Sequence, residues 1–404
     1  MRCGVSLYLQ AHQDWDRYLA FERGEKVPPL DPGLDHQTVT SELDLAIEAE
    51  ELGFDSLWAI EHHCTPYGMS PNPLQMLAYL AGATKRVDVG TQVVVVPWNQ
   101  PLRVAEQITM LQYALRGRTP YIGFGRGAAR REFQQMDINK SESAGRFHEG
   151  VEVIKLAITQ DVFSYHGEHY HFDNVTMRPR PLDPQALLDA MHFAWGSPTS
   201  PPIGAKLGLK PLIVPQRAWS AYRPELATFD AARREAGYAS ARPRIHMIAY
   251  VGETARQAEE GAAKHVAEYA VSAINHYELT GSHFARTKGY EHYAKMAPHY
   301  TAQSIIDSYV NNHAWGTPDV VLKKIQSIAE AFHPEEFTFV FRYGSMTHEQ
   351  GERNLRLFAR EVLPALHELK VQEPLEFAAG EAAGDFSWQF GPDAEKAVKA
   401  GQGS

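Results

Sequence analysis

Cysteine is scarce in this sequence: the 404 residues contain only two, Cys3 and Cys64. Two cysteines cannot form a disulfide framework or supply a thiolate zinc site, and such low usage is typical of proteins kept in a reducing cytosol. The scarcity excludes a small disulfide-stabilised scaffold, and we expect a cytoplasmic location.

Long hydrophobic runs and an excess of basic charge are also lacking. No stretch approaches the ~20 apolar residues of a membrane-spanning helix, and the apolar run at the N-terminus is too short for a signal peptide. The formal net charge is −10, so neither a nucleic acid nor a membrane is an expected partner. A content of 44% hydrophobic and 22% charged residues is typical of a soluble globular enzyme.

Eight short apolar runs alternate with amphipathic segments along the chain. The run at 87–96 is almost continuously apolar, which is typical of a parallel strand covered on both faces. The predicted strands are residues 5–9, 54–60, 87–96, 121–124, 190–195, 211–214, 244–251 and 337–341. The predicted helices are residues 38–52, 71–84, 101–115, 144–159, 200–207, 224–235, 254–271, 318–331 and 348–366.

This alternation predicts an α/β fold with a parallel sheet. Eight strand–helix units over about 360 residues indicate a (β/α)8 TIM barrel with insertions and a C-terminal tail. An open doubly wound sheet is the alternative, although no G-x-G-x-x-G motif follows an early strand. We expect a barrel domain over residues 1–368 and a polar, disordered tail over residues 369–404.

Three insertions to the barrel are expected. Residues 11–36 are rich in charge and proline and predict a loop, and residues 163–180 predict a hairpin outside the barrel. Residues 275–301 predict an active-site loop or lid, although an interface loop would have the same composition. The aromatic and histidine residues of this last segment are His276, Tyr277, His283, Phe284, Tyr290, His292 and Tyr293.

Three ionisable residues, Glu61, His62 and His63, follow the second predicted strand. In a barrel of parallel strands this end of the strand carries the chemistry, which favours an acid–base role over simple capping. A zinc site would need further ligands from other strand ends, and none is evident after the first strand. The hairpin histidines His166, His169 and His171 are more typical of a solvated face, so no metal is predicted.

Two turns predict an anion-binding site. In Gly125-Arg126-Gly127, glycines permit close backbone approach and the arginine offers a fork of donors to a phosphate or carboxylate. In the run from Gly196 to Pro202, hydroxyls and free N–H groups at the N-terminus of a predicted helix offer a second set of donors. A solvated arginine turn and an ordinary helix cap remain the plainer alternatives. Aromatic residues at predicted strand ends add an apolar pocket: Trp58, Trp98, Phe124, Trp195 and Trp219.

Taken in order, these pieces resemble the bacterial luciferase-like, flavin-dependent monooxygenases. The resemblance covers roughly residues 1–366. It rests on the run from Ala49 to His63, on Asn72-Pro73, on the run from Val89 to Pro97, on Pro101-Leu102-Arg103, on Gly125-Arg126-Gly127 with Glu132-Phe133, on the serines after the fifth strand, on Lys288-Gly289-Tyr290 and on Gly316-Thr317-Pro318.

The resemblance implies a TIM barrel that binds FMN at its C-terminal mouth. His62 then matches the histidine that assists catalysis, Glu61 the carboxylate beside the flavin ring, and Arg126 the arginine that contacts the phosphate. A non-proline cis peptide is implied between Gln92 and Val93, and His63 is expected only to support the site. The residues expected to bind the cofactor are Gln92, Val93, Gly125, Arg126, Gly196, Ser197 and Ser200.

The function implied by the resemblance is that of a two-component monooxygenase. A separate NAD(P)H:flavin reductase would supply FMNH2, and a C4a-peroxyflavin formed with O2 would insert one oxygen atom into a small, largely apolar organic substrate. A homodimer is expected. The alternatives are an F420-dependent dehydrogenase with the same barrel, or a non-catalytic partner subunit, which the retained Glu61-His62-His63 and Arg126 argue against.

Two departures from the luciferase pattern bear on the reaction. Gly125 stands where the active luciferase subunit has a reactive thiol, and Gly196 stands where it has an acidic residue in the phosphate region. Bioluminescence is therefore not expected.

Overall fold

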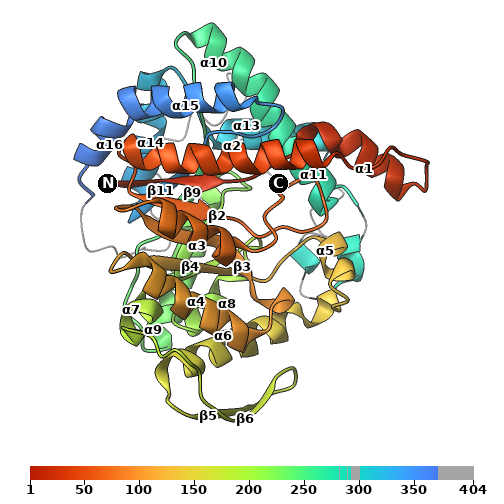
Figure 1. Ribbon diagram of the computed structural model, residues 1–404. Helices are drawn as coiled ribbons and strands as arrows, with labels where there is room; N and C mark the ends of the chain where they lie inside the picture. The colour runs from red at the N-terminus through yellow and green to blue at the C-terminus, as the bar shows by residue number, and fades with distance from the viewer. Residues whose placement is uncertain (282, 289, 293–300, 372–404) are drawn as a thin grey trace, which may run out of the picture.

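Eight parallel strands close into a barrel in the computed structural model (Figure 1), which describes residues 1–281, 283–288, 290–292 and 301–371. In spatial order the strands are β1 (Arg2–Leu7), β2 (Ser56–Ala59), β3 (Asp88–Val95), β4 (Pro120–Gly125), β7 (Met191–Ala194), β8 (Lys210–Ile213), β9 (Arg244–Val251) and β11 (Glu336–Val340). Pairing of β11 with β1 and of β8 with β9 closes the ring. The predicted TIM barrel is confirmed. A further short strand, β10 (Ala314–Gly316), pairs with the end of β9.

Helices cover the outside of the barrel (Figure 1). They are α2 (Pro32–Glu51), α3 (Pro73–Ala83), α4 (Pro101–Leu115), α6 (Ser143–Thr159), α8 (Pro201–Lys206), α9 (Tyr222–Glu235), α10 (Ala255–Gly261), α11 (Ala267–Tyr277), α14 (Pro318–Phe332), α15 (His348–Glu361) and α16 (Leu363–Glu368). Several begin as their sequences predict: the Asn72 side chain accepts a hydrogen bond from the Gln75 N–H, and Pro73 fills the first helical position.

Two predicted loops contain helices instead. Residues 11–36 include α1 (Trp15–Glu22) and the first turn of α2. In α1 only Trp15 is buried, so the helix has almost no apolar face for the sequence to reveal. The predicted lid begins inside α11, because α10 and α11 run on through one π-helical turn (Ala262–Val266) and end at Tyr277.

Three further helices were not predicted: α5 (Arg130–Gln135), α7 (Pro184–Asp189) and α13 (Ala302–Asn312). The first two have six residues each, too few for a helical period to be visible. Part of the expected lid, including Tyr293, and the expected tail from residue 372 onward lie outside the described residues.

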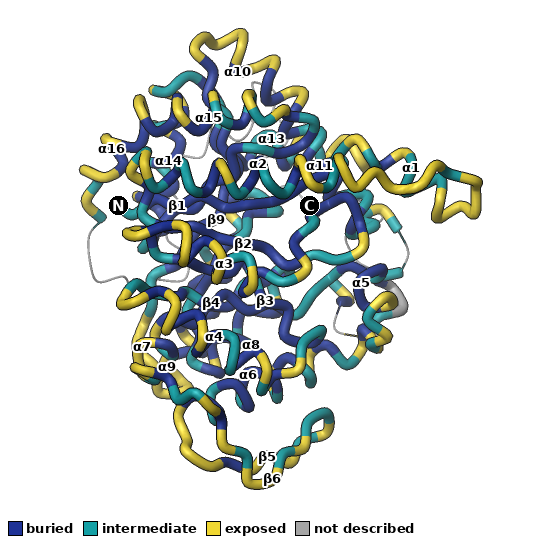
Figure 2. The backbone as a smooth tube through the Cα atoms, in the orientation of Figure 1, coloured by how far each residue is buried: buried dark blue, intermediate teal, exposed yellow. Residues whose placement is uncertain are grey.

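The predicted hairpin is confirmed as β5 (Phe163–His166) and β6 (His171–Val175), which pair antiparallel outside the barrel. Figure 2 shows its exposed residues below the buried strands. His166 contacts Asp173 there at 3.1 Å. Across the part of the chain that the structure describes, no helix has both the length and the apolar character needed to cross a membrane.

Polar side chains fill much of the barrel interior. Arg244 of β9 forms an ion pair with Glu336 of β11 and stacks over the Tyr121 ring at 3.7 Å from its centroid. One layer further, the Gln92 side-chain amide and the His246 ring both contact the Thr338 hydroxyl, at 2.6 and 3.3 Å. A buried polar group of this kind is tolerated when it is hydrogen-bonded. A buried charge is tolerated when it has a partner of opposite charge.

We predict that His246 and His313 make the protein sensitive to acid. Burial lowers the pKa of each imidazole from 6.5 to about 3. Between these values the unfolded chain binds protons that the folded chain excludes, so stability falls as the pH falls. From pH 7 to pH 5 each histidine should cost about 2 kcal/mol of unfolding free energy. Urea denaturation at both pH values measures this loss.

The variant His246→Gln is the control, because it keeps a polar group beside Thr338 but removes one titrating imidazole. Its loss of stability between pH 7 and pH 5 should be smaller than that of the wild type by about 2 kcal/mol. An equal pH dependence in the two proteins would contradict the assignment.

Candidate active site

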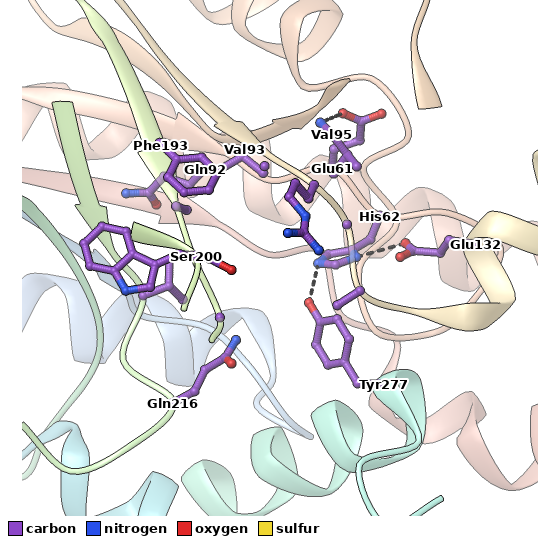
Figure 3. Close-up of a pocket in the computed structure, with 18 of the residues that line it drawn as sticks. Glu61, His62, Gln92, Val93, Val95, Glu132, Phe193, Ser200, Gln216 and Tyr277 are labelled. Atoms are coloured by element: carbon purple, nitrogen blue, oxygen red, sulfur yellow. Dashed lines mark hydrogen bonds and ion pairs between the residues drawn. The ribbon is translucent and has the colours of Figure 1, made fainter. Parts of the chain in front are cut away.

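All nine residues predicted for the site line one cavity, of about 150 Å³, at the C-terminal mouth of the barrel. They come from the loop after β2, from the second half of β3, from the end of β4 and the loop after it, and from the turn after β7, and these strands are neighbours. These residues are Glu61, His62, Gln92, Val93, Gly125, Arg126, Gly196, Ser197 and Ser200. In Figure 3, His62 lies on one side of the cavity, while Ser200 and Gln216 lie across from it.

The Glu61 carboxylate is buried and holds the end of β3 in place. One oxygen accepts the Val95 N–H at 2.6 Å, and the other accepts the Asn99 side-chain amide at 2.9 Å. His63 places its Nε2 3.1 Å from the latter oxygen and packs its ring against Trp98. Three neighbours occupy the carboxylate, so Glu61 shapes the cavity wall and His63 supports it.

His62 is oriented by a second buried carboxylate, Glu132 of α5. The His62 Nδ1 lies 2.9 Å from Glu132 Oε1, and the same oxygen accepts the His63 backbone N–H at 2.8 Å. With Nδ1–H donating to a carboxylate, Nε2 of the neutral His62 ring carries the lone pair. This Nε2 lies 3.4 Å from the Tyr277 hydroxyl (Figure 3). The nitrogen that is not bound to Glu132 therefore contacts another residue of the cavity wall.

A second imidazole completes the cluster around Glu132. His276 Nε2 lies 3.3 Å from Glu132 Oε2, and its Nδ1 lies 2.8 Å from the Thr65 hydroxyl. Burial lowers the pKa of His276, which keeps the ring neutral near pH 7. Burial alone would raise the pKa of Glu132, but His276 and His62 outweigh it and hold that pKa well below its usual range. Glu132 is thus an ionised carboxylate between two imidazoles.

Among the described residues, His62, Glu132 and His276 are also the group whose ligand atoms lie close enough to hold a metal ion, all within 4.8 Å. Two histidines and a carboxylate are a known zinc donor set. Here the contact of His62 Nδ1 with Glu132 and that of His276 Nδ1 with Thr65 account for the positions of the two rings. His276 Nε2 and Glu132 Oε2 form a close ion-pair contact without hydrogen-bond geometry. We assign no metal to it.

The polar end of the cavity contains Arg126, Ser197 and Ser200. The Ser197 hydroxyl lies 2.7 Å from that of Ser200. The expected donors at the start of α8 are mostly missing, because Pro201 and Pro202 have no N–H and the Ser200 N–H already donates to the Ser197 carbonyl. Any anion here would be bound by hydroxyls and the guanidinium rather than by the helix N-terminus.

Gly125 is required where β4 approaches β3. A Cβ atom at this position would lie 2.5 Å from a Val93 methyl group, which no real side chain tolerates. The Gln92–Val93 peptide bond is cis, as the resemblance implied. The guanidinium that follows, that of Arg126, stacks 5.2 Å from the centroid of the Tyr290 ring.

The expected aromatic pocket is only partly correct. Trp98 and Trp195 line the cavity, together with Phe193. Trp58 and Trp219 are completely buried, and neither lines the cavity: Trp58 stacks on Tyr121 inside the barrel, and Trp219 packs on Phe332. The fifth aromatic residue, Phe124, is likewise part of the core.

Comparison with known proteins identifies the family. The family described as luciferase-like monooxygenase matches residues 23–333, which is most of the chain. The chain belongs to this family. The resemblance inferred from the sequence is therefore confirmed.

Two curated relatives illustrate the range of this luciferase-like family. The alkanal monooxygenase alpha chain of Photorhabdus luminescens is 35% identical over 133 residues, a match that spans 32% of this chain and only 36% of the relative. The oxygenase component of flavin-dependent trigonelline monooxygenase from Acinetobacter baylyi is 26% identical, over 83% of this chain and 93% of the relative.

Solved structures confirm the luciferase-like fold. Monooxygenase RslO1 from Streptomyces bottropensis has a TM-score of 0.71 at 24% identity and covers 91% of this chain and all of its own. The oxygenating constituent of 3,6-diketocamphane monooxygenase from Pseudomonas putida, in complex with FMN, has a TM-score of 0.66 at 19% identity, covering 93% and 99%. An F420-dependent secondary alcohol dehydrogenase has a TM-score of 0.63 at 18% identity, covering 90% and 98%.

We predict that Glu132 fixes the tautomer of His62. The variant Glu132→Gln keeps the size of the side chain but replaces an acceptor by an amide that also donates, so the His62 Nδ1–H form should lose its dominance. Nitrogen-15 shifts of the His62 ring report the tautomer. Unfolding free energy should fall by about 1–3 kcal/mol, since buried charge-assisted hydrogen bonds are lost.

The matched control is Glu142→Gln, a change of the same type outside the cluster, where Glu142 pairs with Arg146 on the surface. It should leave both the His62 shifts and the stability nearly unchanged. An unaltered His62 tautomer in Glu132→Gln would show that Glu132 does not orient the ring.

Proposed function

We propose that this protein is the oxygenase of a two-component, FMNH2-dependent monooxygenase that inserts one atom of O2 into a small, largely apolar organic molecule. The observation that carries the proposal is the set of polar groups that line one cavity. An oriented imidazole, that of His62, lines this cavity. The guanidinium of Arg126 and the paired hydroxyls of Ser197 and Ser200 line the same cavity and are donors of the kind that bind a phosphate.

The residues present fit FMN. Arg126, Ser197 and Ser200 offer hydrogen-bond donors suited to a phosphate, and the walls contributed by Val93, Val95 and other apolar side chains suit a flat ring system. When bound and reduced, the flavin supplies the chemistry that activates O2 and delivers one oxygen atom. The proposal therefore includes the reaction expected from the sequence, in which the reduced flavin activates O2 and one oxygen atom is transferred to the substrate.

His62 holds and moves the proton in this proposal. Its Nδ1–H is fixed on the ionised Glu132, so Nε2 is the atom that accepts a proton and later returns it. A positive charge on the ring would be stabilised by the buried carboxylate, as in other histidine–carboxylate pairs. Trp98, Tyr277 and Tyr290 surround the cavity and exclude water from this step.

The comparisons support the cofactor class and leave one alternative. A relative named as an oxygenase component and a structural neighbour named in complex with FMN both favour flavin and a separate reductase. The F420-dependent neighbour keeps hydride transfer with a deazaflavin as the second candidate. A homodimer and an NAD(P)H:flavin reductase partner are included in the proposal.

We predict that His62→Ala abolishes turnover but retains the flavin. The purified protein should consume O2 and oxygenate an apolar substrate only when a flavin reductase, NADH and FMN are added. In His62→Ala, oxygenation should fall by about 100-fold or more, because a positioned acid–base group typically contributes that much, while anaerobic titration should show unchanged FMNH2 affinity.

The converse variant is Arg126→Ala, which should weaken FMNH2 binding in the same titration by roughly tenfold or more because a charge-assisted contact is removed. Binding of F420 in preference to FMN, with no O2 consumption, would overturn the monooxygenase proposal and favour the dehydrogenase.

A further inference from the structure

A second cavity adjoins the first. It measures about 290 Å³ and shares four wall residues with the His62 cavity: Ala128, Gly196, Gln216 and Tyr277. Ligand sites usually enclose about 300–1,000 Å³, and neither cavity alone reaches that range. The shared walls make them two compartments of one site.

The chemistry of the second compartment differs from that of the first. Among the described residues, its walls include Ala221, Leu279 and Ile305, and most of the polar side chains that line it are uncharged. The guanidinium of Arg217 at its edge is bound to both oxygens of Glu225, at 2.7 and 2.8 Å, and to the Gly196 carbonyl. Its positive charge is therefore balanced within the protein. Such a compartment suits an uncharged, largely apolar molecule.

Tyr277 stands at the junction of the two compartments. It ends α11, one residue after His276, whose ring is held by Glu132 and Thr65. The Tyr277 hydroxyl lies 3.4 Å from His62 Nε2, and catalytic hydrogen bonds of this length commonly tighten when ligand binds. The same cluster thus fixes both partners of the His62–Tyr277 contact.

The orientation of His62 determines what Tyr277 offers to a ligand. When the His62 ring is neutral and Glu132 takes its Nδ1–H, the Nε2 lone pair accepts the tyrosine O–H. The tyrosine oxygen then presents its own lone pairs. A ligand that complements it must carry a hydrogen-bond donor, such as a phenolic O–H or an N–H, on an apolar body.

We propose that the second compartment binds the substrate, and that this substrate is an apolar molecule with an O–H or N–H donor that contacts Tyr277. Deprotonation is then balanced: the substrate proton passes to the tyrosine oxygen, and the tyrosine proton passes to His62 Nε2, leaving an imidazolium beside Glu132. The assignment of the ligand as substrate rests on the proposed monooxygenase function.

The test uses two bicyclic probes, 2-naphthol and 2-methoxynaphthalene, which differ in the donor. Equilibrium dialysis with the full chain, with and without saturating FMN, should show that 2-naphthol binds roughly three- to tenfold more tightly, the worth of one net hydrogen bond. In Tyr277→Phe the two probes should bind equally. Equal binding by the wild type, or no binding of either probe in both conditions, would overturn the proposal.

A pair of variants locates the probe. Ala221→Phe places a ring into the second compartment and should abolish binding of both probes while FMN still binds. Ser220→Phe adds the same ring at the neighbouring exposed position and should change nothing. Probe binding that survives Ala221→Phe would refute the location.

The two proposals fail separately. Probe discrimination needs no reductase and no turnover, so its presence without oxygenation would contradict only the monooxygenase function. Reductase-dependent oxygenation without discrimination between the probes would contradict only the role of Tyr277.

Discussion

The site depends on one buried ion, the carboxylate of Glu132. It is completely enclosed, and its charge is tolerated because two imidazoles and a backbone N–H surround it. An isolated charge at this depth would cost several kcal/mol. The fold avoids this cost because the loop after β2, helix α5 and helix α11 place their side chains around the Glu132 carboxylate. These contacts also fix the orientation of His62.

Inside the barrel, beneath the site, buried polar and charged groups must likewise have partners. Its interior has paired polar layers, Arg244 with Glu336 and Thr338 with Gln92 and His246, where many barrels have branched apolar residues. Each group restricts the next, because a buried polar atom without its partner is costly. Gln92 and Tyr8 both contact this interior and line the cavity, so the wall is positioned from the barrel as well as from the loops.

The fold and the cavity were predictable because their signals are local. Apolar runs such as residues 87–96 and a strand-end cluster such as Glu61-His62-His63 are each visible in one short stretch. Glu132 was expected only as part of the family motif and His276 only as part of the lid. Their contacts around His62 were not predicted, since they lie 70 and 214 positions beyond it and only the closed barrel brings them together. The backbone donors expected at the start of α8 are mostly missing for a different reason: its first two residues are prolines, and the Ser200 N–H is already bonded to the Ser197 carbonyl.

The π-helical turn between α10 and α11 determines the direction in which the side chains of α11 point. Such a turn contains one residue more than an α-helical turn, and one residue is worth about 100° of rotation about the helix axis. His276 and Tyr277 lie beyond it and point at Glu132 and His62. One extra residue, two to three turns before His276, therefore determines which side of α11 faces the barrel mouth.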